Sequence, residues 1–516
     1  MPIPYESLHE GQYCHRKVRK SPLIPNIASS FFWKGGGGDT CSCSCLCVQR
    51  AGVVTVVLAV AALTVLGVIL AVTVLERPQP AQNDTLPADN VSAQNSSTDQ
   101  CRILLVESIP LGVTYDEDNV TFGIPLERAW NDLISVATEH VEVASFYWTL
   151  TGEDVNINSS SELPGVGILE RFKALPSRNV SVRVVTSEPS VLTNSSDLNV
   201  LLENGVQVRR VDFGRLTKGV LHSKFWIVDG LHVFIGSANM DWRALTEVKE
   251  LGALIYNCTS LAKDLHKIFQ SFWAMGEPNS SLPEPWPSTY DTTINKDLPL
   301  VVNDGNVSSR IYLSGSPPLF CPASRTQDLE AILSAISEAE RFIDVAVMVY
   351  SPSSRFEHHR RYWPVIDNVI KRAAFEREVK VRMLISCGRD SNPAMLAFLQ
   401  SLASLNYPPL NVRILVRLFI VPVGNKTDIP YARVNHNKYM VTDKVSYIGT
   451  SNWMEDYFSN TAGVGLVVSE HAQDPIQKTR TLHHQLKAVF NRDWNSQFSV
   501  DLDNLGHNPD CALSKP

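Results

Sequence analysis

The sequence has no excess of basic residues, because 46 lysines and arginines stand against 53 acidic residues and the formal net charge is −7. This balance excludes a protein that binds nucleic acid through a globally basic surface, although a local basic pocket is compatible with it. Charged residues are few, at 19%, whereas hydrophobic residues make up 44% of the 516 residues. Such a chain is not mainly disordered, and it is long enough to bury a large core.

Residues 51–75 lack charge altogether. As a helix this run would extend about 37 Å, which predicts a transmembrane anchor rather than a buried core helix or a cleaved signal peptide. Basic residues precede the run, so the positive-inside rule places the N-terminus in the cytosol and the body in the lumen. We therefore expect a cytosolic tail (1–50), a signal-anchor helix (51–75) and a polar glycosylated stalk (76–100).

Sequons for N-glycosylation are absent before the anchor and frequent after it. Their one-sided distribution independently predicts a luminal or extracellular glycoprotein. The eleven sequons are at Asn83, Asn90, Asn95, Asn119, Asn158, Asn179, Asn194, Asn257, Asn279, Asn306 and Asn425.

Cysteines occur on both sides of the anchor. The cluster in residues 41–47 would be cytosolic, where palmitoylation is one interpretation and a zinc site a less favoured one, since no second ligand pair accompanies it. Five cysteines follow the anchor, in a compartment where disulfides persist, and their odd number leaves at least one outside an intrachain pair.

The body contains an internal duplication. Residues 141–148 resemble residues 343–350, residues 180–185 resemble 379–384, and His222-Ser-Lys224 resembles His436-Asn-Lys438, all in the same order. Each half begins with an amphipathic helical pattern and continues with apolar strands that alternate with helices. This order predicts two pseudo-symmetric α/β sandwich domains, 101–290 and 291–516, that share one site at their interface.

The duplicated motif places His and Lys two residues apart, so on a strand both side chains share a face. Asp229-Gly230 is a good hairpin turn, and the next strand ends in Gly-Ser/Thr-x-Asn. Two imidazoles can act as nucleophile and general acid on a phosphodiester, while lysines, asparagines and hydroxyls hold the phosphate oxygens. Because histidine titrates near pH 6.5, a mildly acidic compartment would suit this chemistry.

These residues form the His-x-Lys-x4-Asp…Gly-Ser-x-Asn pattern of the phospholipase D superfamily. The segments 236–252, 435–458 and 419–425 resemble its membrane-anchored branch, family members three and four, and residues 361–368 and 462–468 favour member four. The resemblance implies a lysosomal or endosomal 5′→3′ exonuclease that acts on single-stranded DNA and RNA. It also implies a phosphohistidine intermediate, release of nucleoside 3′-phosphates and a role in limiting nucleic-acid sensing.

The resemblance also implies roles for particular residues. The predicted catalytic residues are His222, Lys224, Asp229, His436, Lys438 and Asp443, and the predicted phosphate ligands are Ser237, Asn239, Thr450 and Asn452. Glu250 lies eleven residues after Asn239, where relatives place a glutamate that orients a histidine, and we expect it to orient His222. The corresponding position after Asn452 is Gly463.

Resemblance and the odd cysteine count together suggest the disulfides Cys101–Cys258 and Cys387–Cys511, with Cys321 unpaired. Aromatic residues near the repeated strands could stack nucleobases, although a place in the core is the more probable interpretation for each. They are Tyr147, Trp148, Tyr350, Trp242 and Trp453.

The sequence predicts no metal or other cofactor for this chemistry. An enzyme that hydrolyses phospholipids or transfers their phosphatidyl groups is the alternative function, and a protein that has kept only the fold is a third one. Expected partners are single-stranded nucleic acid and, through the anchor, a membrane in transit from the endoplasmic reticulum and Golgi to endosomes and lysosomes. A phospholipid substrate and a homodimer remain open.

Overall fold

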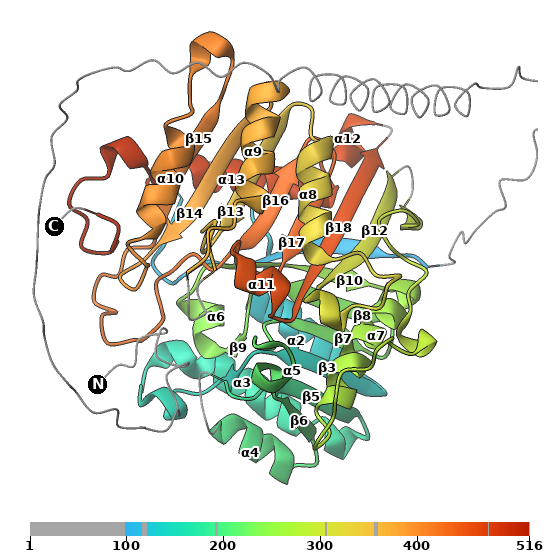
Figure 1. Cartoon of the computed structure of the whole chain (residues 1–516). Coiled ribbons are helices and arrows are strands. Elements are labelled where there is room, and N and C mark those ends of the chain that lie inside the picture. Colours follow the sequence, from blue (N-terminus) through green and yellow to red (C-terminus); the bar gives the residue numbers. More distant parts are fainter. Residues whose placement is uncertain are drawn as a thin grey trace, which may run out of the picture. The chain divides into compact units, whose positions relative to one another are not determined.

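The two copies of the repeat fold into two mixed β-sheets whose central strands have the same order (Figure 1). The computed structural model describes residues 99–115, 121–190, 195–304, 307–354, 360–472 and 474–514. The first sheet has the order β2 (Ile124–Pro125), β1 (Arg102–Ser108), β10 (Glu250–Tyr256), β8 (His232–Gly236), β7 (Phe225–Val228), β3 (His140–Ser145), β5 (Ser181–Ser187) and β6 (Gln207–Val211). The second has the order β11 (Leu300–Asp304), β12 (Val307–Ser316), β18 (Gly463–Ala472), β17 (Ser446–Gly449), β16 (Lys438–Thr442), β13 (Phe342–Val347), β14 (Lys380–Cys387), β15 (Ile414–Ile420) and β19 (Ser499–Asp501).

Strand directions correspond as well. In the first sheet β3 is parallel to β5 and antiparallel to β7, and in the second β13 is parallel to β14 and antiparallel to β16. The duplication and the α/β architecture predicted from the sequence are therefore confirmed. The predicted division after residue 290 falls between the last strand of the first sheet and the first strand of the second.

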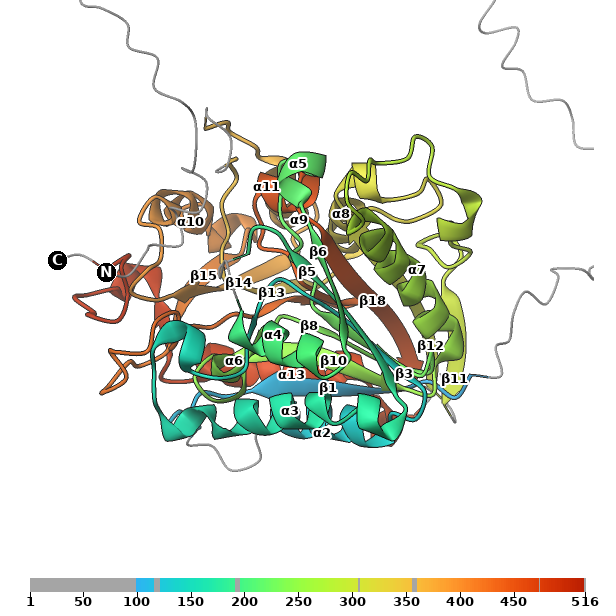
Figure 2. The ribbon, with the colours of Figure 1, turned by 90° about the horizontal axis from the view of Figure 1, so that it is seen from below.

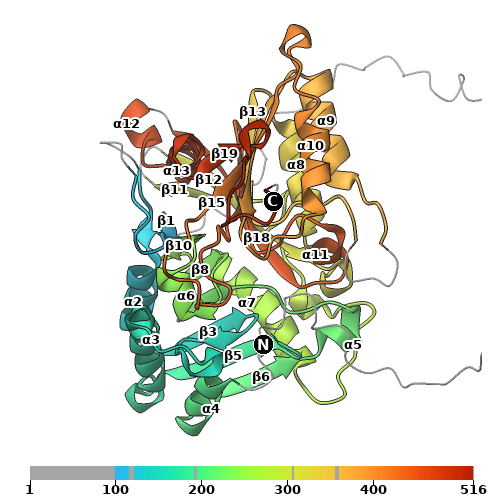
Figure 3. The same cartoon turned by 90° about the vertical axis from the view of Figure 1, so that its left-hand side faces the viewer.

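Helices cover the outer face of each sheet (Figure 3). The first sheet carries α2 (Leu126–Val136), α3 (Leu163–Lys173) and α4 (Ser196–Glu203), and the second carries α8 (Asp328–Glu338), α9 (Val365–Glu376) and α10 (Met395–Ala403). In α2 the buried residues Leu126, Ala129, Trp130, Leu133 and Ile134 repeat at helical spacing, so one stripe faces the sheet.

The inner faces of the two sheets share one core with α7 (Thr259–Met275) and α13 (Leu482–Asn495). A buried charge cluster lies at the same interface. Arg492 on α13 pairs with Glu107 on β1 at 2.8 Å, and Lys249 pairs with Asp493 at 3.0 Å. Because the partners come from both halves and leave few charges unpaired, the cluster fixes how the halves sit against each other.

Four short helices complete the described body: α5 (Phe213–Thr217), α6 (Trp242–Thr246), α11 (Glu455–Ser459) and α12 (Pro475–Lys478). A small ladder pairs β4 (Trp148–Thr149) with β9 (Met240–Asp241). Seen from below, α5 of the first half lies beside α11 of the second (Figure 2). The Thr217 hydroxyl donates a hydrogen bond of 2.5 Å to the Asn460 carbonyl there, so this contact also crosses between the halves.

The two predicted disulfides, Cys101–Cys258 and Cys387–Cys511, are confirmed, and Cys321 is unpaired. The sequon asparagines that fall in the described ranges are all exposed: Asn158, Asn179, Asn257, Asn279 and Asn425. The other six sequons, the predicted cytosolic tail, the predicted anchor and the predicted stalk up to residue 98 lie outside the described residues. Within those residues, the structure has no helix of the length and apolarity that a membrane crossing requires.

Candidate active site

The two His-x-Lys segments lie at the interface between the sheets, each just before or at the start of a strand, β7 or β16. His222, Lys224 and Lys438 are about 1% exposed, whereas the His436 side chain is 13% exposed. Burial lowers the pKa of His222 well below its usual range, and the charges of Lys224, Lys438 and His436 lower it further. The four predicted residues therefore come together in one buried, cationic site.

Each histidine is anchored by the main chain of the opposite half. The His222 N–H donates to the Ala462 carbonyl at 2.9 Å, and the His436 N–H donates to the Lys249 carbonyl at 2.8 Å. Ala462 immediately precedes β18, and Lys249 immediately precedes β10. The reciprocal bonds make the site a product of both halves, since neither histidine is positioned by its own half alone.

The imidazole rings have different partners on Nδ1. His436 Nδ1 lies 2.9 Å and 3.0 Å from the two carboxylate oxygens of Glu250, whereas His222 Nδ1 lies 2.8 Å from the Thr450 carbonyl oxygen. Both partners accept hydrogen bonds, so each ring carries its proton on Nδ1 when neutral and keeps the Nε2 lone pair for chemistry.

The prediction that Glu250 orients His222 is therefore wrong, because its carboxylate binds His436. Glu250 is the first residue of β10, directly after Lys249, whose carbonyl holds the His436 backbone across the interface. A side chain at Gly463, the equivalent position in the second half, would place its Cβ 2.3 Å from the Ser451 hydroxyl oxygen. A larger residue at position 463 would therefore require the neighbouring hydroxyl groups to move.

Two aromatic rings pack against His222. The centroid of Phe146 lies 5.5 Å from the imidazole and that of Tyr457 lies 5.0 Å from it. Phe146 follows β3 and Tyr457 lies on α11, so one ring comes from each half. The sequence analysis missed both. Phe146 occurs inside the repeated segment 141–148 and could have been found there, whereas nothing in the sequence places Tyr457 next to His222.

The lysines have lost much of their affinity for a proton. Burial lowers the pKa of Lys438 to about 7 and that of Lys224 well below its usual range, and the nearby Glu250 opposes both changes. Each ammonium donates to the carbonyl of its own histidine, Lys224 at 2.5 Å and Lys438 at 2.7 Å. A bound phosphate would restore the positive charge that burial disfavours.

The four predicted phosphate ligands divide into two kinds. The side-chain oxygens of Asn239 and Asn452 are buried and have no hydrogen-bond partner in the described part of the chain. Because an amide oxygen only accepts, a phosphate would be bound by the NH2 group of each side chain, which donates. The Ser237 hydroxyl instead donates to Glu250 at 2.5 Å, and the Thr450 hydroxyl oxygen accepts from the Val464 N–H at 3.0 Å. Ser237 thus supports the carboxylate that holds His436.

Asp229 and Asp443 do not belong to the site, which corrects their predicted catalytic role. Asp229 lies at the far end of β7 from His222 and accepts main-chain hydrogen bonds of 2.8–2.9 Å from residues 138–140. Asp443 accepts bonds of 3.0–3.4 Å from residues 340–342 in the same way. Each carboxylate ties a hairpin turn to the start of the neighbouring strand, which is a structural function.

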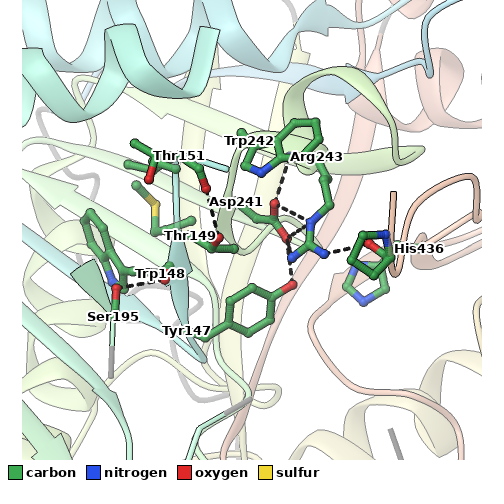
Figure 4. A network of polar contacts seen from close by, with 12 residues as sticks. Tyr147, Trp148, Thr149, Thr151, Ser195, Asp241, Trp242, Arg243 and His436 are labelled. Atoms are coloured by element: carbon green, nitrogen blue, oxygen red, sulfur yellow. Dashed lines mark hydrogen bonds and ion pairs between the residues drawn. The ribbon is translucent and has the colours of Figure 1, made fainter. Parts of the chain in front are cut away.

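Four of the five aromatic candidates belong to the core. Trp148, Tyr350, Trp242 and Trp453 are at most 1% exposed, as the core interpretation predicts. Tyr147 is half-buried, and its hydroxyl points toward the Asp241 carboxylate (Figure 4).

Only one group of acidic, histidine and cysteine side chains in the described ranges has the spacing of a metal site. It combines Asp99 with Cys101 and Cys258. The two cysteines form a disulfide, so the group is not suited to a metal ion.

The chain matches the family model described as "PLD3/4, PLD-like domain" over residues 117–424. It is 48% identical over 429 residues to 5′-3′ exonuclease PLD4 of Mus musculus, covering 83% of this chain and 84% of that protein. It is 47% identical over 407 residues to 5′-3′ exonuclease PLD3 of Homo sapiens, covering 78% and 81%. Among solved structures, a phosphatidylserine synthase from Haemophilus influenzae Rd KW20 is 13% identical with a TM-score of 0.49 over 73% of this chain and 85% of that one.

Proposed function

The chain belongs to the family of PLD3/4 PLD-like domains, and we propose that it is a 5′→3′ exonuclease that hydrolyses single-stranded DNA and RNA by way of a phosphohistidine. One observation carries this proposal. Two histidines, each with Nδ1 held by an acceptor, meet two lysines and two unpartnered asparagine amides in one buried site built by both halves. These groups can supply a nucleophile, a general acid and phosphate ligands for two successive displacements at a phosphodiester.

The two histidines differ in how readily they take up a proton. Burial lowers the pKa of both, but Glu250 raises that of His436, while only a carbonyl oxygen supports His222. His436 is consequently the first of the pair to become protonated as the pH falls. We assign His222 as the nucleophile and His436 as the general acid, with Glu250 stabilising the imidazolium.

The reaction then proceeds in two steps. Nε2 of His222 attacks phosphorus, the bond from phosphorus to O5′ of the second nucleotide breaks, and His436 gives its proton to that oxygen. In the second step His436, now neutral, takes a proton from water as the water oxygen attacks phosphorus and the bond to His222 breaks. The products are the terminal nucleoside 3′-phosphate and a strand one nucleotide shorter with a 5′-hydroxyl.

The two histidines differ in their access to solvent. His222, Lys224 and Lys438 are almost inaccessible, whereas the His436 side chain is partly exposed. This difference is consistent with His436 as the group that meets the leaving oxygen of a strand end. The phospholipid alternative is less favoured, because the relatives reported above carry exonuclease names.

The first experiment uses the purified full-length chain at about pH 5 with a 5′-hydroxyl single-stranded DNA. We expect stepwise release of nucleoside 3′-phosphates from the 5′ end, abolished by His222→Ala and by His436→Ala. Thymidine 3′-(4-nitrophenyl phosphate) has a leaving group that needs no acid. In His436→Ala it should therefore release one equivalent of nitrophenol and leave a thymidine 3′-phosphoryl group on Nε2 of His222. A thymidine 3′-phosphoryl group found on His436 in His222→Ala would reverse the two roles.

The proposed setting is the lumen of an acidic organelle, with residues 51–75 as the membrane anchor. Support comes from the exposure of the described sequon asparagines, Asn158 and Asn425 among them, and from two disulfides, which an oxidising compartment maintains. Protease protection of the body in intact vesicles, with loss of mass on glycosidase treatment, would be expected. A body that proteases digest in intact vesicles would place it in the cytosol instead.

A further inference from the structure

A group of polar contacts beside the site has no part in the chemistry described so far (Figure 4). The Arg243 guanidinium binds the Asp241 carboxylate at 2.8–3.0 Å, and the Tyr147 hydroxyl donates to the same carboxylate at 2.9 Å. Another Arg243 nitrogen donates to the Pro430 carbonyl at 2.6 Å. Asp241 balances the charge of Arg243. Through its hydrogen bond to Pro430, Arg243 links the first half to the loop of the second half that contains Pro430.

This loop, residues 421–435, joins β15 to the segment that bears His436. The first half fixes it at several points before it reaches the histidine. The Arg433 N–H donates to the Glu247 carbonyl at 2.9 Å, and the Lys249 N–H donates to the Val434 carbonyl at 3.0 Å. The loop conformation is therefore set by the same interface that sets His436.

Tyr431 lies in this loop in an unusual backbone conformation. Its φ angle is +54°, and that of Arg433 is +58°. Both lie in the left-handed region, which residues other than glycine seldom adopt. Such conformations cost free energy and persist where the surrounding structure enforces them, commonly at functional sites. The Tyr431 ring is half-buried, and the Arg243 guanidinium carbon lies 6.0 Å from its centroid. The structure thus maintains a strained backbone that holds an aromatic ring beside Arg243, in the loop that leads to His436.

We propose that Tyr431 is a stacking platform for the base of the second nucleotide, the first residue of the strand that remains after cleavage. This proposal rests on the proposed function. The general acid His436 must reach O5′ of the second nucleotide, and the loop of Tyr431 leads directly to His436. The second base is consequently the one nearest to this loop. Stacking on an aromatic ring suits any base, as an exonuclease requires, because every base presents a π-face.

The test is a double-mutant cycle between Tyr431 and a missing base. Oligonucleotides with an abasic residue at position 1, 2 or 3 are compared using the full-length wild-type chain and Tyr431→Ala. In the wild type, removal of base 2 should raise KM roughly 5- to 150-fold, the range set by one base–aromatic stack, with little change in kcat. Tyr431→Ala should raise KM for the intact strand by a similar factor and should show no further penalty for the missing base 2, while penalties at positions 1 and 3 persist.

Two further variants separate stacking from folding. Tyr431→Phe keeps the ring and should behave as the wild type, whereas Tyr407→Ala, which removes an exposed tyrosine of the second half, serves as the matched control. A two-residue substrate with an abasic second residue should be cleaved equally by the wild type and Tyr431→Ala, which would also show that the variant is folded. An undiminished penalty for removing base 2 in Tyr431→Ala would overturn the platform. A wild type that releases no nucleotide from any oligonucleotide would instead overturn the proposed function.

Discussion

Replacing Glu250 by glutamine removes a negative charge from His436 but keeps an oxygen that can accept the Nδ1 proton. The carboxylate lies 2.9–3.0 Å from that nitrogen, and the two side chains are 4% and 13% exposed, so solvent screens the pair only weakly. Burial lowers the pKa of His436 and Glu250 opposes this effect. Without the charge, we expect the imidazolium to lose its proton at a lower pH.

The size of the change follows from the kind of hydrogen bond. A bond to a charged group contributes about 1.5–3 kcal/mol and a neutral one about 0.5–1.5 kcal/mol, so the exchange costs the imidazolium roughly 1–1.5 kcal/mol. At about 1.4 kcal/mol per pKa unit, this is a shift of roughly one unit. Because His436 must be protonated to donate, the alkaline limb of the kcat profile should move about one unit toward acid. The acid limb, which reports protonation of His222, should stay in place.

The same substitution acts on substrate binding. Burial already lowers the pKa of Lys438 to about 7, and Glu250 raises it, so Glu250→Gln should neutralise this lysine at a lower pH. The phosphate then loses a cationic partner, and KM should begin to rise at a lower pH than in the wild type. A residue that acts through His436 alone would change only the kcat profile. Glu250→Gln should also change the pH dependence of KM, because Glu250 acts on Lys438 as well.

The assay measures kcat and KM for one oligonucleotide between pH 4 and pH 8 at constant ionic strength. Glu170→Gln removes an exposed carboxylate on α3 and serves as the matched control, with both limbs unchanged. If Glu250→Gln lowers kcat equally at every pH, the residue only maintains structure. If its alkaline limb coincides with that of the wild type, the charge of Glu250 does not set the proton affinity of His436, and our role assignment fails.

Three further predictions concern stability. Asp229→Ala and Asp443→Ala should lower the thermal midpoint of unfolding by several degrees, because each variant loses several main-chain hydrogen bonds. The kcat of the folded fraction should stay within about threefold of the wild type. A loss of kcat without a loss of stability would return these residues to the active site. Gly219→Ala would place a Cβ 2.1 Å from the Asn460 carbonyl oxygen, so both the midpoint and kcat should fall, the strain costing about 1–3 kcal/mol in chemical denaturation. Burial raises the pKa of Asp197 to about 6, above its unfolded value near 4, so its contribution should favour folding at acidic pH and be lost as the pH rises toward 6. Asp197→Asn should flatten that part of the stability profile measured by denaturation from pH 4 to pH 8, and an unchanged slope would contradict the reasoning.

The sequence predicts the features that repeat locally. The alternation of strands and helices in two equivalent halves follows from the duplicated apolar segments, and the pairing of each histidine with its lysine follows from the two-residue period of a strand. The turn at Asp229-Gly230 is also correct, since both residues have positive φ angles. Each of these features depends on residues a few positions apart, so a pattern in the sequence is sufficient to find it.

The contacts between the halves could not be predicted in the same way. Spacing within the first motif connects Glu250 to His222, but the fold delivers its carboxylate to His436 because β10 begins at the interface. The cluster of Glu107, Arg492 and Lys249 is likewise assembled from residues hundreds of positions apart. Sequence periodicity carries no information about which half supplies such a partner.

The different partners that the two halves supply explain how a duplicated motif gives two different histidines. Identical partners would have given the two histidines similar proton affinities, whichever half supplied them. Support from the opposite half makes the affinity of each histidine depend on the other copy, through the Glu250 carboxylate for His436 and through the Thr450 carbonyl for His222. His222 therefore has a neutral carbonyl partner and His436 an anionic one, which is the difference a nucleophile and an acid require.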